Sequence, residues 1–265
     1  MLISWKTCSS AELKTIHTNT TLSGAKGTLL SSGDDTAMIG GVAGGSRVVT
    51  QAGGDLIIKS PQNTDVHDER HESQGLSALV PLLGNKFNVS AYDSRHQLSG
   101  DYQSVGQQSG IQAGDGGYEV TAGGQTQLTG SAITSTQAAI DAGLNRFTTA
   151  GKTAVDALAS GDLAVTDLNN AAHYDAESLS VSASLSQAGP RGGVGLGEDS
   201  GRASSTTASA ISGLAGNQDA RTGDAETGLA PIFDADNVRN DVQAQAEITQ
   251  AFGSQASKEW GGLCQ

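Results

Sequence analysis

The chain has 265 residues, which is enough for one long domain or two ordinary ones. Its 15 basic and 28 acidic residues give a net charge of −13, which argues against a nucleic-acid or anionic-lipid partner, since both need clustered Lys and Arg. Aromatic residues are only 4% of the chain, against 36 glycines, so the composition favours thin layers of Val, Ile, Leu and Ala over a thick globular interior.

The ends of the chain carry few signals. Residues 1–27 are expected to be irregular, and the first 16 contain no apolar segment of the kind that a signal peptide needs. Cys8 and Cys264 form no CxxC motif and no disulfide framework, and neither has an assigned role. We therefore expect either a protein that stays inside the cell or a piece of one whose export signal lies upstream.

From residue 28 onward, short β-like runs alternate with Gly, Ser and Asp. The first four runs begin 8, 11 and 9 residues apart, and strands at this spacing with turn residues between them predict an all-β structure. A polar stretch, 62–75, and the most apolar stretch of the chain, 76–84, then predict a loop or hairpin that leaves the repeated strands. The apolar stretch is too short to cross a bilayer. The predicted strands are 28–30, 36–39, 47–50, 56–59, 117–121, 125–129 and 163–166.

An internal repeat links distant parts of this pattern. The sequence Gly-Asp-Leu-Ile-Ile from Gly54 recurs as Gly-Asp-Leu-Ala-Val from Gly161, 107 residues later, with a looser copy before Gln125. Repeated strand–turn units with few aromatics predict a stacked β-solenoid, and a β-sandwich is the alternative. The expected core residues are Val48, Ile57, Val120, Leu128, Leu163 and Val165.

The second half of the chain is expected to be less regular. The Ala- and Thr-rich stretch 132–158 indicates partial helix, and the Gly/Ser-rich stretch 187–228 is typical of a flexible linker. An amphipathic helix is predicted over 236–252, ended by Gly253. Its apolar face, made of Val238, Val242, Ala246, Ile248 and Phe252, needs a partner, either the solenoid, whose end it could cap, or a segment beyond Gln265.

One pair of histidines suggests metal chemistry. His67 and His71 are four residues apart, as in zinc proteases, and would share a helix face. However, Asp68 stands where that chemistry needs a glutamate, and no helical pattern or third ligand accompanies the pair. A solvated polar turn is the alternative to a metal-dependent hydrolase.

Other motifs lack the context that their chemistry requires. The glycines from Gly193 to Gly197 have no preceding strand and predict linker, not a dinucleotide loop. Gly114-Asp115-Gly116-Gly117 predicts a tight turn entering a strand, not a calcium repeat. Asp34 and Asp35 lie in a turn between strands, without a cleft. We therefore expect no catalytic, cofactor-binding or metal-ligating residue, no cofactor, and no enzyme.

Three ordered segments resemble a known family. Within 36–64, GGDLIIKSPQNT resembles the end of a haemagglutinin repeat in filamentous-haemagglutinin-like exoproteins, and QSGIQAGDGG within 101–128 resembles the later repeats of that family. The segment 221–256, with PIFDADNVR and AEITQAFG, resembles the stretch between these repeats and a C-terminal toxin region.

The resemblance implies a fold and a role. Such exoproteins are exported by two-partner secretion and act as adhesins or in contact-dependent growth inhibition, and their repeats form a right-handed parallel β-helix. It implies a cell-surface or secreted location, a target-cell receptor and an outer-membrane secretion partner for the full exoprotein, of which this chain is expected to be a fragment. The alternative role that it implies is a delivery segment of a contact-dependent growth inhibition toxin whose toxin domain is missing here. Open β-helix ends would favour self-association. The expected division is 1–27 irregular, 28–186 β-helix, 187–228 linker, 229–258 helical segment and 259–265 tail.

Overall fold

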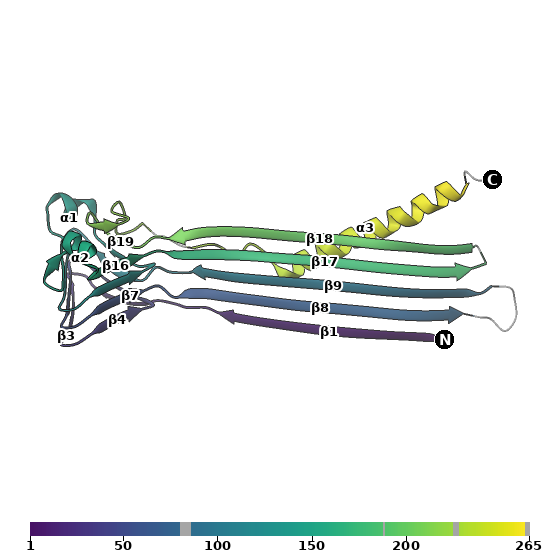
Figure 1. The fold of residues 1–265 in the computed structure, drawn as a ribbon, viewed down its shortest axis with the longest axis horizontal. Coiled ribbons are helices and arrows are strands. Elements are labelled where there is room, and N and C mark those ends of the chain that lie inside the picture. Colours follow the sequence, from purple (N-terminus) through teal and green to yellow (C-terminus); the bar gives the residue numbers. More distant parts are fainter. Residues whose placement is uncertain (80–85, 188, 225–227, 263–265) are drawn as a thin grey trace.

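The residues that the structure describes form two connected β assemblies, two short helices and a long C-terminal helix. The computed structural model describes residues 1–79, 86–187, 189–224 and 228–262. One assembly is a compact stack of short strands, and the other is a flat sheet of five long strands that extends from the stack (Figure 1). The prediction of a mostly β chain that ends in a helix is confirmed.

The stack contains three sheets of mainly parallel strands. Successive short strands visit the three sheets in turn, so that strands three apart in the first two turns are hydrogen-bonded neighbours. The first sheet contains β2 (Thr20–Gly24), β5 (Gly41–Gly45), β10 (Gly110–Ala113), β13 (Ala132–Thr134), β19 (Ala210–Ile211) and β20 (Ala215–Gly216). The second contains β3 (Thr28–Ser32), β6 (Val48–Ala52), β11 (Tyr118–Ala122), β14 (Arg146–Thr149) and β15 (Lys152–Thr153). The third contains β4 (Thr36–Ile39), β7 (Leu56–Lys59), β12 (Thr126–Thr129) and β16 (Leu163–Thr166).

Branched aliphatic residues fill the centre of the stack. Val48, Val120, Leu128 and Leu163 are buried as predicted, and Val165 is half-buried against them. The prediction for Ile57 is wrong. Its neighbours Leu56 and Ile58 are fully buried, and because side chains alternate along a strand, Ile57 points outward.

The internal repeat appears as vertical stacking in the third sheet. Leu56, Thr126 and Leu163 pair in adjacent strands, so the three sequence copies lie one above another. The Oδ1 of Asp35 accepts a hydrogen bond from the amide of Asp55 at 2.8 Å, and the Oδ1 of Asp55 accepts one from Gln125 at 2.7 Å. A Cβ on Gly54 would lie 2.1 Å from the Asp35 carboxylate, so the turn needs glycine there. The two aspartates thus fasten the first turn to the second and the second to the third.

Two short helices lie where partial helix was predicted. They are α1 (Gln137–Asp141) and α2 (Ala154–Ser160). Thr136 and Thr153 cap their first turns by accepting hydrogen bonds from the backbone. Both helices belong to the turn formed by β13, β14 and β16.

Long strands leave and re-enter the stack at one corner. They are β1 (Leu2–Thr15), β8 (Gln62–Leu79), β9 (Asn88–Val105), β17 (Leu168–Ser186) and β18 (Gly189–Thr207), and they pair antiparallel in that order. The hairpin predicted near 76–84 is formed by β8 and β9, although residues 80–84 lie outside the described part of the chain.

The contents of three predicted segments differ from the expectation. Residues 1–27, expected to be irregular, contain β1 and β2, and the region 28–186 includes strands of the antiparallel sheet as well as the stack. Strand β18 occupies much of the predicted linker at 187–228. Gly- and Ser-rich sequence has low intrinsic strand preference. Here the backbone of β18 pairs with β17 over its whole length, and tertiary contacts override that preference.

The C-terminal helix α3 (Ala235–Gly262) lies on one face of the long-stranded sheet and not on an end of the stack. Val238, Val242 and Ala246 are buried against the sheet, whereas Ile248 and Phe252 are exposed. The helix crosses the strands obliquely, so its later turns leave the edge of the sheet (Figure 1). It also continues through Gly253, since glycine inside a helix costs only about 1 kcal/mol. The predicted end at Gly253 is therefore wrong.

Candidate functional site beneath the C-terminal helix

Helix α3 rests on a strip of alternate glycines in β18. A Cβ on Gly195 would lie 2.2 Å from the carbonyl oxygen of Ala246, and one on Gly197 would lie 2.1 Å from that of Val242. Only glycine lets the helix backbone approach this closely. The segment 193–197 is therefore neither a linker nor a dinucleotide loop, and its glycines form the seat of a helix.

A buried ion pair fixes the start of the helix. Arg239 on α3 donates from Nε to Oε1 of Glu69 on β8 at 2.8 Å, and its Nη2 bonds the second carboxylate oxygen. A third bond joins Arg239 to Asp236 at 2.7 Å. The hydrogen bond from Arg239 holds the pKa of Glu69 below its ordinary range, although burial alone would raise it.

Two histidines lie beside this pair. His67 Nε2 lies 3.4 Å from Glu69 Oε2, and His96 is buried on the neighbouring strand β9. Neither ring nitrogen of His96 has a hydrogen-bond partner, and burial lowers the pKa of this side chain. A neutral imidazole is the form that such a site favours.

The proposed zinc pair does not converge. His67 and His71 lie on strand β8, not on a helix or in a turn, so four residues place them about 13 Å apart. In residues 1–79, 86–187, 189–224 and 228–262, no three His, Cys, Asp or Glu side chains are grouped to hold a metal ion. His71 instead pairs across the sheet with His96 on one side and with exposed Cys8 on the other. Cys264 lies outside the described residues.

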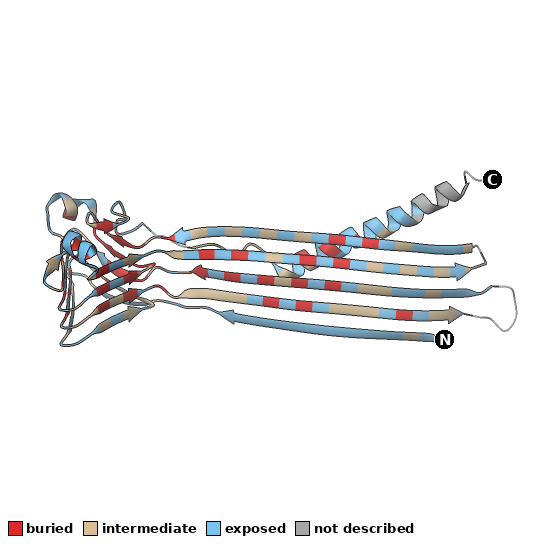
Figure 2. Cartoon of the chain, in the orientation of Figure 1, coloured by how far each residue is buried: buried red, intermediate tan, exposed pale blue. Residues whose placement is uncertain are grey.

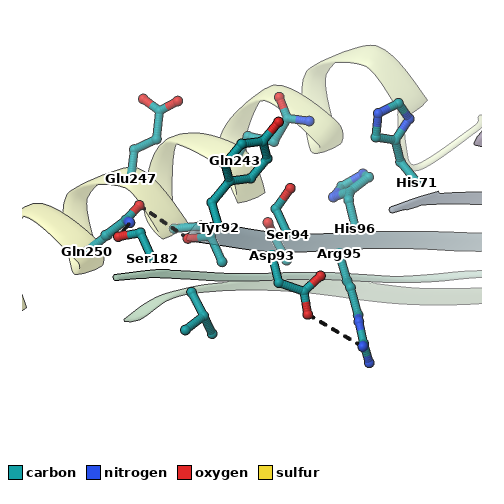
Figure 3. Close-up of a pocket in the computed structure, with 14 residues that line it drawn as sticks. His71, Tyr92, Asp93, Ser94, Arg95, His96, Ser182, Gln243, Glu247 and Gln250 are labelled. Carbon is teal, nitrogen blue, oxygen red and sulfur yellow. Dashed lines mark hydrogen bonds and ion pairs between the residues drawn. The ribbon is translucent and has the colours of Figure 1, made fainter. Parts of the chain in front are cut away.

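A cavity of about 300 Å³ lies between α3 and the sheet (Figure 3). Its helix wall includes Gln243, Glu247 and Gln250, and its sheet wall includes His71 and His96. Serines from β9 and β17 also line it, but His96 contacts none of them through a hydrogen bond, so it forms no serine–histidine dyad. The polar contacts that are present, such as Gln250 Nε2 to Ser182 Oγ at 2.6 Å, hold the helix to the sheet.

The other sequence candidates have structural roles. Of the acidic pair, Asp35 accepts a hydrogen bond from the Asp55 amide through its carboxylate. Asp34 accepts one from the Gly54 amide through its backbone carbonyl at 3.1 Å, so both join the first turn to the second. Asp115 accepts a hydrogen bond from the Thr136 hydroxyl at 2.8 Å, in the turn directly before β11, which confirms the predicted strand-entry turn. The docking of Arg239 on Glu69 could not be found from sequence, because the partners are 170 residues apart.

Comparisons with known proteins connect this architecture to a family. The family model for the haemagglutinin repeat matches residues 3–76, which span β1, two turns of the stack and most of β8. A protein named Toxin CdiA from Escherichia coli is 30% identical over 270 residues, which cover 92% of this chain. This chain is a filamentous-haemagglutinin-like sequence of the CdiA kind.

Other relatives agree. Toxin CdiA of Yersinia pestis is 31% identical over 91% of the CdiA-like chain, and Deoxyribonuclease CdiA of Yersinia pseudotuberculosis serotype O:3 is 30% identical over 91%. The chain spans only 8% of the length of the Escherichia coli and Yersinia pestis proteins and 23% of the Yersinia pseudotuberculosis protein. No solved structure matches it.

This relationship agrees with the expected location, as part of an exoprotein that is secreted or displayed at the bacterial surface. In the described part of the CdiA-like chain, no helix is long and apolar enough to cross a membrane.

Proposed function

We propose that this CdiA-like chain is a non-catalytic structural and interaction segment of a large bacterial surface exoprotein, acting in adhesion or cell–cell contact. The observation that carries the proposal is the three-sheet stack with its fastened turns, a rigid unit that lengthens by repetition. We propose that the stack has the right-handed β-helix form. No residue is assigned a catalytic, cofactor-binding or metal role.

In the full exoprotein, export would depend on an outer-membrane secretion partner, and contact would involve a receptor on the target cell. The acidic balance of the chain disfavours nucleic acid as that partner. Self-association is a further contact that we propose, through the first turn of the stack. Within the described residues, β2, β3 and β4 each pair on one side only, and such open strand edges support end-to-end association with another copy.

Binding to cells tests the interaction half of this proposal. Fluorescently labelled chain is mixed with bacterial cells and measured by flow cytometry, with unlabelled chain as competitor. We expect saturable, competed binding and no cleavage of tRNA or DNA by the purified chain. Non-saturable binding would leave only a spacer role, and nuclease activity would overturn the non-catalytic assignment.

A delivery role is the second candidate, because relatives are named Toxin, tRNA nuclease and Deoxyribonuclease CdiA. The two candidates separate in an exoprotein that carries both this segment and a toxin domain. If the segment is replaced by an unrelated β-solenoid of equal length, a role in adhesion predicts that attachment to target cells is lost, whereas a spacer role predicts that attachment and growth inhibition both persist. A delivery role predicts that target-cell attachment persists while inhibition is lost.

A further inference from the structure

The outer half of the long-stranded sheet has most of its exposed apolar residues on the face opposite α3, although Leu2, Leu79 and Tyr92 are exposed on the helix-bearing face. In β18 the glycines of 193–197 face the helix, so the alternate residues Val194 and Leu196 face the other way and are 49% and 57% exposed. Strand β17 repeats this pattern. Ser178, Ser180 and Ser182 border the cavity under α3, and Leu179, Val181 and Leu185 point to the opposite face.

The remaining strands extend the same surface. Cross-strand pairing puts Trp5, Gln74, Asp93, Val181 and Val194 in one row on that face. Trp5 is 62% exposed, and a hollow of about 390 Å³ lies beside it. We call this surface the free apolar face. Its exposed members are Trp5, Leu76, Val89, Leu179, Val181, Leu185, Val194 and Leu196.

The half of the same face nearer to the stack is charged. Its side chains include Asp68, Arg70, Asp101, Asp175, Glu177, Glu198 and Arg202, with five acidic groups against two basic ones. Within the free apolar face, Asp93 forms an ion pair with Arg95 at 3.5 Å, and Glu72 pairs with Arg70 at 3.1 Å at the border with the charged half. Most of the exposed apolar side chains thus lie in the outer half and most of the carboxylates in the half nearer to the stack, where Leu13 and Val66 are the exposed aliphatic exceptions.

We propose that the free apolar face binds the same face of a second copy of this chain, sheet against sheet. The separation along the strands favours a two-fold arrangement in which the copies point in opposite directions. Each acidic half then extends past the tip of the other copy, which keeps the two negative surfaces apart despite the net charge of −13.

The available area fits a weak dimer. Five strands at about 4.8 Å and seven residues at about 3.4 Å give a patch of roughly 24 by 24 Å on each copy. Two such patches bury about 1,100 Å², near the lower limit of about 1,000–1,200 Å² for a specific interface. Large aliphatic side chains without a glycine strip suit packing of two sheets about 10 Å apart, whereas the helix-bearing face needed glycines.

Sedimentation of the purified full chain tests the proposal. Wild type is compared with Val181→Asp and Val194→Asp on the free apolar face, and with Leu29→Lys on the open edge of the first turn, where Leu29 is 66% exposed. Circular dichroism and thermal melting check that each variant folds. We expect a concentration-dependent dimer whose Kd rises at least tenfold in both aspartate variants and is unchanged in Leu29→Lys.

Other results would overturn it. Wild type that stays monomeric to millimolar concentration would mean that the free apolar face does not pair. A dimer that Leu29→Lys abolishes and the aspartate variants leave intact would place association at the open edge. Monomeric protein that binds phosphatidylcholine vesicles through Val181 and Val194 would identify lipid as the occupant and contradict the dimer.

Discussion

Arg239 and Glu69 join the last element of the chain to the second strand of the long-stranded sheet through two hydrogen bonds, although 170 residues separate them. Glu69 is 7% exposed, so the loss of its partner would leave a largely buried carboxylate without a counter-charge. The pair therefore controls whether α3 stays on the sheet.

Replacement of one partner should be costly. We expect Arg239→Met to destabilise the folded chain by about 3–5 kcal/mol, because it leaves a buried carboxylate without a counter-charge. The double variant Glu69→Leu/Arg239→Met should recover much of this loss. Urea unfolding of the wild type, both single variants and the double variant gives the coupling energy. If the stability losses of the two single variants add up to the loss in the double variant, the pair is not coupled.

The glycine strip makes a second prediction. Gly195→Val should displace α3, since even its Cβ would lie 2.2 Å from the carbonyl of Ala246. Hydrogen exchange should then accelerate in residues 235–250 while the stack remains protected. Val194→Ala, whose side chain lies on the opposite face of the same strand, is the matched control and should leave exchange in α3 unchanged. If the α3 amides of Gly195→Val stay protected, glycine at position 195 is not needed for α3 to pack on β18.

The register of β7 makes a third prediction. Ile58 is fully buried, so Ile58→Ala should cost about 2–5 kcal/mol, whereas Ile57→Ala should cost about 1 kcal/mol or less. Thermal or urea unfolding distinguishes them directly. The reverse order would restore the register that the sequence first suggested.

Acid should weaken the site in two steps. His96 has a lowered pKa in the fold, so the unfolded chain binds its proton first, and stability falls as the pH drops below about 6.5. Glu69 also has a lowered pKa, so its contribution is complete above about 4.5 and is lost as the pH falls through the folded value. His71, Glu69 and Arg239 are the charged or titratable groups that act on His96.

Two variants separate the steps. His96→Leu should make the loss below pH 6.5 shallower. Glu69→Gln should reduce the loss below pH 4.5, where Asp162, whose pKa is also lowered in the fold by Lys152, continues to contribute. His173→Leu, which replaces an exposed histidine of β17, is the matched control for His96→Leu. Thermal melting across pH 3–8 measures both, and parallel curves for the wild type and His96→Leu would contradict the assignment.

Turn chemistry explains which parts of the fold the sequence predicts. The short strands are bounded by Gly, Ser and Asp, and Asp55 carries both the repeat signal and the contact that stacks it. It was harder to predict which side chains of β7 point inward, since Leu56, Ile57 and Ile58 are consecutive aliphatic residues with no polar residue to mark the outer face. Strand β18 could not be predicted because its glycines allow the close packing of α3, a contact that no local sequence pattern indicates.

The spacing between neighbouring long strands equals the spacing between successive turns of the stack. In the described chain each turn is joined to one long strand: β1 enters the first turn, β8 leaves the second, β9 enters the third, β17 leaves the fourth and β18 enters the fifth. Both assemblies therefore grow by one strand spacing, about 4.8 Å, per turn. Lengthening this architecture without mismatch requires a unit of two turns and one hairpin, the 107-residue offset between Gly54 and Gly161. Gain or loss of a single turn would leave a long strand without its partner, so natural length variants should differ by whole units.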